Sequence, residues 1–220
     1  MKKSSSDQSV EDVRRRMVDY SITFEISARP VLDYGEDQDL IHDIDGKIFH
    51  EEGMEKRARV GAIWAQKLDL GEALERRVSM YEVCDAESGE LFEAYEAIFE
   101  KGSRVREDLE LESFGDILIV HTITIDEKHR GRKLGLVALL QTIKTLGGGC
   151  SMVVIKPFPL QFSCKVTKKN EKQCLDAQEK LATYWRRLNF MRIPDTEYYY
   201  FDLTHLMPTA EELLGIGDEE

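Results

Sequence analysis

The sequence has few of the features that mark a membrane, secreted or metal-binding protein. No apolar run approaches the length that spans a bilayer, and the first residues, MKKSSSDQSVEDVRRR, have no apolar segment behind their charges. We therefore expect no membrane partner, no secretory signal and a cytoplasmic location. The four cysteines are scattered, without a CxxC pair or clustered histidines, which predicts free, mostly buried thiols and no metal site.

A surplus of positive charge is also missing, because the formal net charge is −12 at pH 7. Nucleic-acid backbones are bound by summed positive charge, so we expect no nucleic-acid partner. The densest basic run, KHRGRK at residues 128–133, remains as a local patch. A basic patch of this size on an acidic protein suits a small polyanion better than a duplex.

Internal repeats and low-complexity tracts are absent, and a hydrophobic share of 42% with a charged share of 33% is typical of a soluble globular protein. The 220 residues are enough to bury a sizeable core. We predict a disordered N-terminal end over 1–16, a single domain over 17–207, and a C-terminal tail over 208–220 that could begin as a short helix.

The N-terminal half predicts strands followed by helices. Alternating apolar residues predict a strand over 20–27 and a long strand over 57–70. Between them, Asp45-Gly46 is a candidate turn. Helical spacing predicts two packing helices, over 71–85 and 89–101. The second predicted helix has an acidic face, which is either simply solvated or attracts a cationic acceptor. Its residues are Glu90, Glu93, Glu96 and Glu100.

The central stretch from Asp116 to Leu146 predicts a strand, a basic glycine turn and a helix. Residues 117–125 are nearly all apolar or β-branched, as in a strand covered on both faces, with His121 and Thr124 as interruptions. A histidine in such a strand is more often a hydrogen-bonded core residue than a catalyst. The turn leaves free N–H groups at the start of the helix, where the helix dipole favours an anionic phosphate.

Three glycines at 147–149 end this helix, and a second apolar strand follows at 150–155. The spacing suits a right-handed crossover that makes the two strands parallel neighbours. Residues 160–172 predict an irregular loop, followed by a helix from about 173 and a strand over 197–203. The whole predicts a mixed α/β (α+β) fold.

The segment from Asp116 to about Leu203 resembles the GNAT superfamily of N-acetyltransferases. ITIDEKHRGRKLGLVALL is similar to the family's acyl-CoA segment, a strand, a turn of pattern Arg/Gln-x-x-Gly-x-Gly/Ala and a helix. YWRRLNF followed by EYYYFDL is similar to its closing Tyr-x-x-x-Gly-Phe helix end and last strand. The resemblance implies a GNAT-like mixed central sheet flanked by helices, here with an elaborated N-terminal third.

The resemblance also implies a site for coenzyme A. Arg130 matches the leading Arg/Gln of the turn and Gly135 the second glycine, so backbone N–H groups from Arg132 to Leu136 would hold the pyrophosphate. Ile123 and Ile125 are at the positions whose backbone pairs with the pantetheine arm. The implied cofactor-binding residues are Ile123, Ile125, Arg130, Gly131, Arg132, Lys133, Leu134, Gly135 and Leu136.

Three features depart from the family pattern. Lys133 replaces the first glycine of the turn, where its side chain would either crowd the phosphates or add a positive charge. Trp185 and Asn189 replace tyrosine and glycine at the helix end, and asparagine tolerates the left-handed conformation required there. The helices predicted over 71–101 lie just before the central strand, whereas the family's early helices follow its first strand.

The function implied is acyl transfer from acetyl-CoA or another acyl-CoA to an amine, either a small molecule or a peptide, without a metal. Its catalytic candidates are His121 as base, with Glu96 or Asp116 as substitutes, and Tyr184 as acid. A degenerate GNAT-fold binding or regulatory module is the alternative, and a homodimer is allowed for. A nucleotide-phosphate module is disfavoured because the turn lacks the P-loop spacing and a dinucleotide fingerprint.

Overall fold

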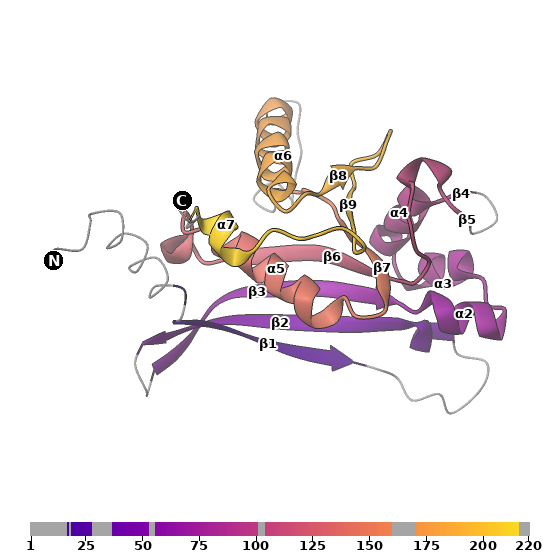
Figure 1. Ribbon diagram of the computed structural model, residues 1–220, viewed down its shortest axis with the longest axis horizontal. Helices are drawn as coiled ribbons and strands as arrows, with labels where there is room; N and C mark the ends of the chain where they lie inside the picture. Colours follow the sequence, from indigo (N-terminus) through magenta and orange to yellow (C-terminus); the bar gives the residue numbers. More distant parts are fainter. Residues whose placement is uncertain are drawn as a thin grey trace, which may run out of the picture.

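A computed structural model describes residues 17, 19–27, 37–52, 56–100, 104–159 and 170–215 (Figure 1). The N-terminal end expected to be disordered, residues 1–16, lies outside the described residues. The same holds for most of the loop expected over 160–172.

A seven-stranded sheet in the order β1-β2-β3-β6-β7-β9-β8 forms the centre of the fold. Its only parallel pair is β6 with β7, so the sheet is mixed and mostly antiparallel. The predicted fold class is confirmed. In this order along the sheet, the strands are β1 (Tyr20–Ser27), β2 (Ile41–Glu52), β3 (Lys56–Leu68), β6 (Asp116–Ile125), β7 (Cys150–Ile155), β9 (Tyr199–Asp202) and β8 (Met191–Arg192).

Helices cover both faces of the sheet and come from different parts of the chain. The three between β3 and β6 are α2 (Leu70–Arg76), α3 (Met80–Glu87) and α4 (Gly89–Ile98). The later ones are α5 (Leu134–Leu146), α6 (Glu171–Arg186) and α7 (Ala210–Leu214). Short elements complete the chain: η1 (Asp37–Leu40), η2 (Glu107–Leu109) and η3 (Glu127–His129), and a small sheet of β4 (Phe99–Glu100) and β5 (Arg104–Val105).

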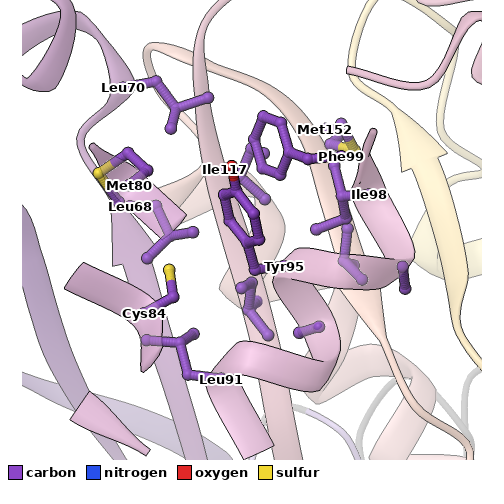
Figure 2. Packing of buried hydrophobic residues seen from close by; sticks show 14 of the residues in the cluster. Leu68, Leu70, Met80, Cys84, Leu91, Tyr95, Ile98, Phe99, Ile117 and Met152 are labelled. Atoms are coloured by element: carbon purple, nitrogen blue, oxygen red, sulfur yellow. The ribbon is translucent and has the colours of Figure 1, made fainter. Parts of the chain in front are cut away.

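Helices α2, α3 and α4 pack on one face of the sheet around an apolar cluster (Figure 2). Tyr95 and Phe99 stack in it with ring centroids 4.4 Å apart, and Ile117 of β6 and Met152 of β7 supply the sheet side. In Figure 1 these helices gather at one end of the sheet. Between β1 and β2 the described residues hold only η1, so the helices on this face come from the segment after β3.

Helices α5, α6 and α7 contribute to a second apolar cluster on the opposite face. Leu118 and Val120 of β6 point into it, whereas Ile117 and Ile119 point into the first cluster. Both faces of β6 are therefore covered, as its apolar sequence predicted. Figure 1 shows α7 lying alongside α5, and Leu213 of α7 is buried in this cluster.

Strand β6 is irregular where it passes the end of β7. Trp64 of β3 pairs with Thr122, but the next residue, Ala65, pairs with Val120, so His121 is the extra residue of a β-bulge. On the other side, the parallel pairing with β7 stops at Val120 and Ile155. Residues 121–125 thus extend past the end of β7, and the two strands part at the bulge.

The turn predicted at Asp45-Gly46 is wrong, because β2 runs unbroken through both residues. Gly46 marks a close approach of side chains: a Cβ there would lie 2.9 Å from Cβ of Ile63 and 3.1 Å from the ring of Phe24. An Asp-Gly pair is typical of a turn, but here the glycine allows side chains of the adjacent strands to pack closely.

The helix predicted over 71–85 is instead two helices. Arg77 adopts a left-handed conformation with φ 57° and ends α2, and Ser79 begins α3. The helix predicted over 89–101 ends earlier, at Ile98, because Phe99 and Glu100 pair with β5. Residue 101, the last residue of the predicted helix, lies outside the described residues.

We expect Gly46→Ala to lower the free energy of unfolding by about 1–3 kcal/mol, because the added methyl group overpacks the contact with Ile63. Urea unfolding measures this. Gly89→Ala is the matched control: its Cβ would meet no atom within 4 Å, so stability should stay the same or rise by up to ~1 kcal/mol. Equal midpoints for Gly46→Ala and wild type would contradict the packing role of Gly46.

Candidate active site

The turn after β6 presents backbone N–H groups at the start of α5. Gly131 and Lys133 both adopt left-handed conformations, with φ 77° and 60°. Lys133 is the N-cap residue of α5, and no side chain caps this helix. In this described segment, the N–H groups from Arg132 to Gly135 have no backbone acceptor. An uncapped helix N-terminus of this kind attracts an anion.

Two arginines fix the turn in different ways. Arg130 donates from Nε to the carbonyl of Ile125 at 2.7 Å, which folds the turn back onto the end of β6. Arg132 donates to the hydroxyl of Tyr20 on β1 at 3.2 Å, and this hydroxyl lies 3.0 Å from Nδ1 of His129. The turn is therefore tied to both β6 and the edge strand β1.

The Lys133 side chain points away from the helix N-terminus. Its ammonium donates to the carbonyl of Leu214 at 2.9 Å, at the end of α7, where Arg187 also donates to the carbonyl of Leu213 at 2.9 Å. Burial and then the nearby Arg187 charge lower the pKa of Lys133. A left-handed residue other than glycine is strained, but here the side chain fastens α7. This contact differs from both alternatives that the sequence offered for Lys133, which were that its side chain crowds the phosphates or adds a positive charge beside them.

A cleft of about 770 Å³ opens beside the turn. Its cationic residues are Arg130, Lys133 and Lys180, with the imidazole of His129 beside them, and no Asp or Glu is among the described residues that line it. The remaining lining is mostly apolar and comes from the end of β6, the start of α5, residues 158–159 and one side of α6. The cleft is therefore suited to a ligand that is anionic at one end and apolar along its length.

The end of β6 runs beside this cleft with no described strand paired to it on that side, and Arg130 donates to its Ile125 carbonyl. The Asp126 N–H donates to the Val60 carbonyl at 2.8 Å, so the even-numbered residues here direct their backbone groups toward β3. Because backbone groups alternate along a strand, those of Ile123 and Ile125 face the side where β7 has ended. Both residues line the cleft.

Two aromatic residues of α6 form the far wall of the cleft. Tyr184 lines it and accepts a hydrogen bond from the Leu136 N–H at 3.2 Å, while burial raises the pKa of its hydroxyl. Trp185 also lines it, and its Nε1 is buried without a hydrogen-bond partner among the described residues. A buried indole N–H normally has a partner, so an acceptor placed in the cleft would satisfy it.

His121 lies on the opposite face of the sheet from the cleft. Its Nε2 is 2.8 Å from Oε1 of Gln66, its Nδ1 is 3.4 Å from Oε1 of Glu90, and its ring stacks on Trp64 with centroids 4.2 Å apart. The hydrogen bond with His121 lowers the pKa of Glu90 more than burial raises it. His121 is therefore held at the bulge by groups from β3 and α4.

The two substitute bases occupy different surroundings. Asp116 starts β6, and a strand of 10 residues places it ~30 Å from Ile125. It accepts from the Leu70 N–H at 3.1 Å and pairs with Lys67 at 3.0 Å, so it joins α2 to the sheet. Glu96 is exposed on α4, away from the cleft lining.

Of the predicted cofactor-binding residues, the structure gathers all but two along the cleft: Ile123, Ile125, Arg130, Gly131, Lys133, Leu134 and Gly135. Arg132 and Leu136 contact Tyr20 and Tyr184 instead. Sequence reasoning missed Thr124 and His129, which lie in the same segment as the predicted residues, and the residues supplied by distant segments, namely Phe158, Pro159, Ala177, Lys180, Leu181 and Trp185. The amphipathic pattern of α6 indicated that it packs but not that it borders a cleft.

Three cysteines are free, as predicted: Cys84, Cys150 and Cys174. Burial raises the pKa of the Cys84 thiol to about 12 and that of Cys150 to about 11. Cys164 lies outside the described residues. Within the described ranges, no group of His, Cys, Asp or Glu side chains could hold a metal ion, and no helix there has the length and apolar content of a membrane span.

We expect Lys133→Met to loosen α7 while leaving coenzyme A affinity within ~threefold of wild type, because the variant keeps the backbone N–H and loses only the bond to Leu214. Hydrogen exchange of the α7 amides should become faster, and calorimetry measures the affinity. Lys144→Met, an exposed lysine in the last turn of α5, is the control. A large loss of affinity with unchanged exchange in α7 would contradict this role.

No protein-family model and no curated protein sequence matches the chain. Solved structures do match. A KacTA–DNA complex is 11% identical with a TM-score of 0.43, and the match covers 84% of this chain and 94% of that chain. AtaT complexed with acetyl-methionyl-tRNA is 10% identical with a TM-score of 0.40, covering 84% and 96%. An apo agmatine N-acetyltransferase variant is 14% identical with a TM-score of 0.39, covering 83% and 100%.

Two of these structures contain a nucleic acid, which contradicts the expectation of no nucleic-acid partner. That exclusion used the net charge of −12, a sum over the whole chain. The structure shows that cationic residues gather locally, since Arg130, Lys133 and Lys180 line one cleft without an acidic residue among the described lining. Net charge therefore does not exclude a nucleic-acid partner.

Identities and TM-scores of this size carry no argument about substrate or activity. The order of elements in this chain does bear on the fold: β6, a glycine turn, α5, the parallel strand β7, α6 and β9 follow the pattern of the resemblance. Asn189 is left-handed with φ 63°, as predicted for the helix end. The resemblance to GNAT acetyltransferases is confirmed as a likeness of fold, and the chain has a GNAT-like mixed sheet.

Proposed function

We propose that the protein transfers an acyl group, most simply acetyl, from acyl-CoA to an amine. The cleft beside the turn is the observation that carries this proposal. It joins an uncapped helix N-terminus and the side chains of Arg130 and Lys180 to an apolar wall, and its described lining has no carboxylate. Coenzyme A has the same distribution, with phosphates at one end and an uncharged pantetheine arm at the other.

The residues present fit this ligand along its length. The free N–H groups from Arg132 to Gly135 would hold the pyrophosphate, with Arg130 beside them. The open backbone edge at Ile123 and Ile125 would pair with the pantetheine amides. The unpartnered N–H of Trp185 would donate to an acceptor on the same arm. When bound, acyl-CoA supplies an activated thioester.

The reaction forms a bond between the amine nitrogen and the acyl carbon and breaks the bond between that carbon and sulfur. One proton leaves the amine, and the departing thiolate takes up one. His121 is at the bulge where β6 and β7 part, which favours it as the group that removes the amine proton. The hydroxyl of Tyr184 accepts from Leu136 and keeps its own proton, so we retain it as a candidate donor.

A GNAT-like binding module without turnover is the second candidate. The contacts of His121 favour it, because Nε2 faces the Gln66 oxygen and Nδ1 faces the Glu90 carboxylate. A ring donating to both acceptors has no lone pair left to accept a proton. Trp185 also favours it, since an indole at the family's tyrosine position does not release a proton.

We expect Arg130→Glu to weaken coenzyme A binding about tenfold or more, because it places a negative charge beside the helix N-terminus. Isothermal calorimetry measures the dissociation constant. Arg104→Glu, an exposed reversal on β5, should bind like wild type. Unchanged affinity in Arg130→Glu, or no binding of coenzyme A to wild-type protein at millimolar concentration, would sink the assignment of the cleft.

We expect His121→Asn to lower kcat by about 10²–10⁴-fold without changing coenzyme A affinity, since the histidine lies on the other face of the sheet from the cleft. His205→Asn, an exposed histidine, is the control. If wild-type protein binds coenzyme A but acetylates no amine in a broad panel, the binding module is the better description.

A further inference from the structure

Charged residues gather on the α4 face of the sheet, at the point where β6 and β7 part. We call Glu90, Glu93 and Glu197 the acidic rim. Glu90 and Glu93 lie in the first turns of α4, and Glu197 precedes β9. Their side chains are 52%, 61% and 56% exposed, so all three carboxylates are open to a ligand.

Helix α4 lies across the gap between the two strands. On the β6 side, Glu90 faces His121 at 3.4 Å. On the β7 side, Lys156, the residue after that strand, pairs with Glu93 at 3.1 Å and with Glu197 at 3.2 Å. The acidic rim therefore borders the same gap that exposes Ile123 and Ile125 to the cleft on the opposite face.

Lys156 compensates only part of this negative charge. Three carboxylates face one lysine and one histidine, and a single negative charge remains even when His121 is protonated. Burial lowers the pKa of Lys156, but hydrogen bonds to Glu93 and Glu197 raise it further, so the lysine is charged. The net charge of these five side chains is therefore negative near pH 7.

Tyr198 provides a second and independent sign of a ligand. The residue is only 5% exposed, and its hydroxyl has no hydrogen-bond partner among the described residues. Nζ of Lys156, which pairs with Glu93 and Glu197, lies 5.2 Å from the centre of the Tyr198 ring, so this ring borders the acidic rim. Burial and then the charges of Glu93, Glu90 and Glu197 raise the pKa of its hydroxyl. A buried hydroxyl without a partner is unfavourable, and a ligand in the rim would supply one.

We propose that the acidic rim and the Tyr198 hydroxyl bind the second positive charge of the acceptor, an aliphatic amine that carries another cationic group. This rests on the proposed function and names its substrate class. The reacting nitrogen must be uncharged to attack the thioester, so carboxylates contribute little to holding it. They bind a second group that stays charged throughout the reaction.

Three probes of one length test the substrate class: 1,4-diaminobutane, butylamine and 4-aminobutanoate carry a positive, neutral or negative group opposite the reacting amine. Calorimetry with wild-type protein, with and without saturating coenzyme A, measures their binding directly. We expect the diamine to bind at least about tenfold more tightly than butylamine, and the amino acid most weakly. Equal affinities for all three overturn the proposal.

Variants locate the binding to the rim. Glu93→Gln and Glu197→Gln should each remove most of the preference for the diamine, whereas Glu82→Gln, an exposed carboxylate on α3, should retain it. Tyr198→Phe should weaken diamine binding without lowering the thermal midpoint, because the hydroxyl makes no hydrogen bond to lose. Diamine preference that survives in Glu93→Gln, Glu197→Gln and Tyr198→Phe places the site elsewhere.

The measurements separate this inference from the proposed function. If the diamine binds the rim but no acetylated product forms with acetyl-CoA, acyl transfer fails and the cation site stands. If amines are acetylated at rates independent of a second charge, acyl transfer stands and the cation site is wrong.

Discussion

β7 ends at Ile155 while β6 continues to Ile125, and beyond Val120 no strand among the described residues pairs with this edge of β6. Such an edge is costly unless something else bonds to it. In this fold the same gap serves both faces: the cleft beside α5 and α6 opens toward it on one side, and α4 lies across it on the other. A ligand that extends through the gap would contact side chains on both faces of the sheet.

The two faces of the sheet carry charges of opposite sign near this gap. The cleft has cationic side chains and a helix N-terminus, whereas the α4 side has three carboxylates around Lys156. The sheet separates these charges, so each can attract its own ligand without neutralising the other. A net charge of −12 therefore does not argue against the proposed polyanionic ligand, because the cleft that would hold it has no carboxylate in its described lining.

The sequence predicted the elements whose signals are local. The β6–turn–α5 segment, the parallel strand β7 and the left-handed Asn189 follow from periodicity, glycines and residue type. It did not predict which residues meet across the fold. The attachment of Lys133 to α7, the contacts of His121 with Gln66 and Glu90, and the position of α6 along the cleft depend on tertiary packing. The turn predicted at Asp45-Gly46 is wrong for the same reason, since the side chains that surround Gly46 come from the neighbouring strands.

The bulge at His121 has a consequence for how β6 can vary. Before it, the even-numbered residues Leu118 and Val120 point toward α5, and after it the odd-numbered Ile123 and Ile125 do. The extra residue therefore resets the alternation just before the cleft. Substitutions along the strand change single contacts, but an insertion or deletion between the bulge and the turn would exchange the two faces. The length of this short segment is thus more tightly constrained than its composition.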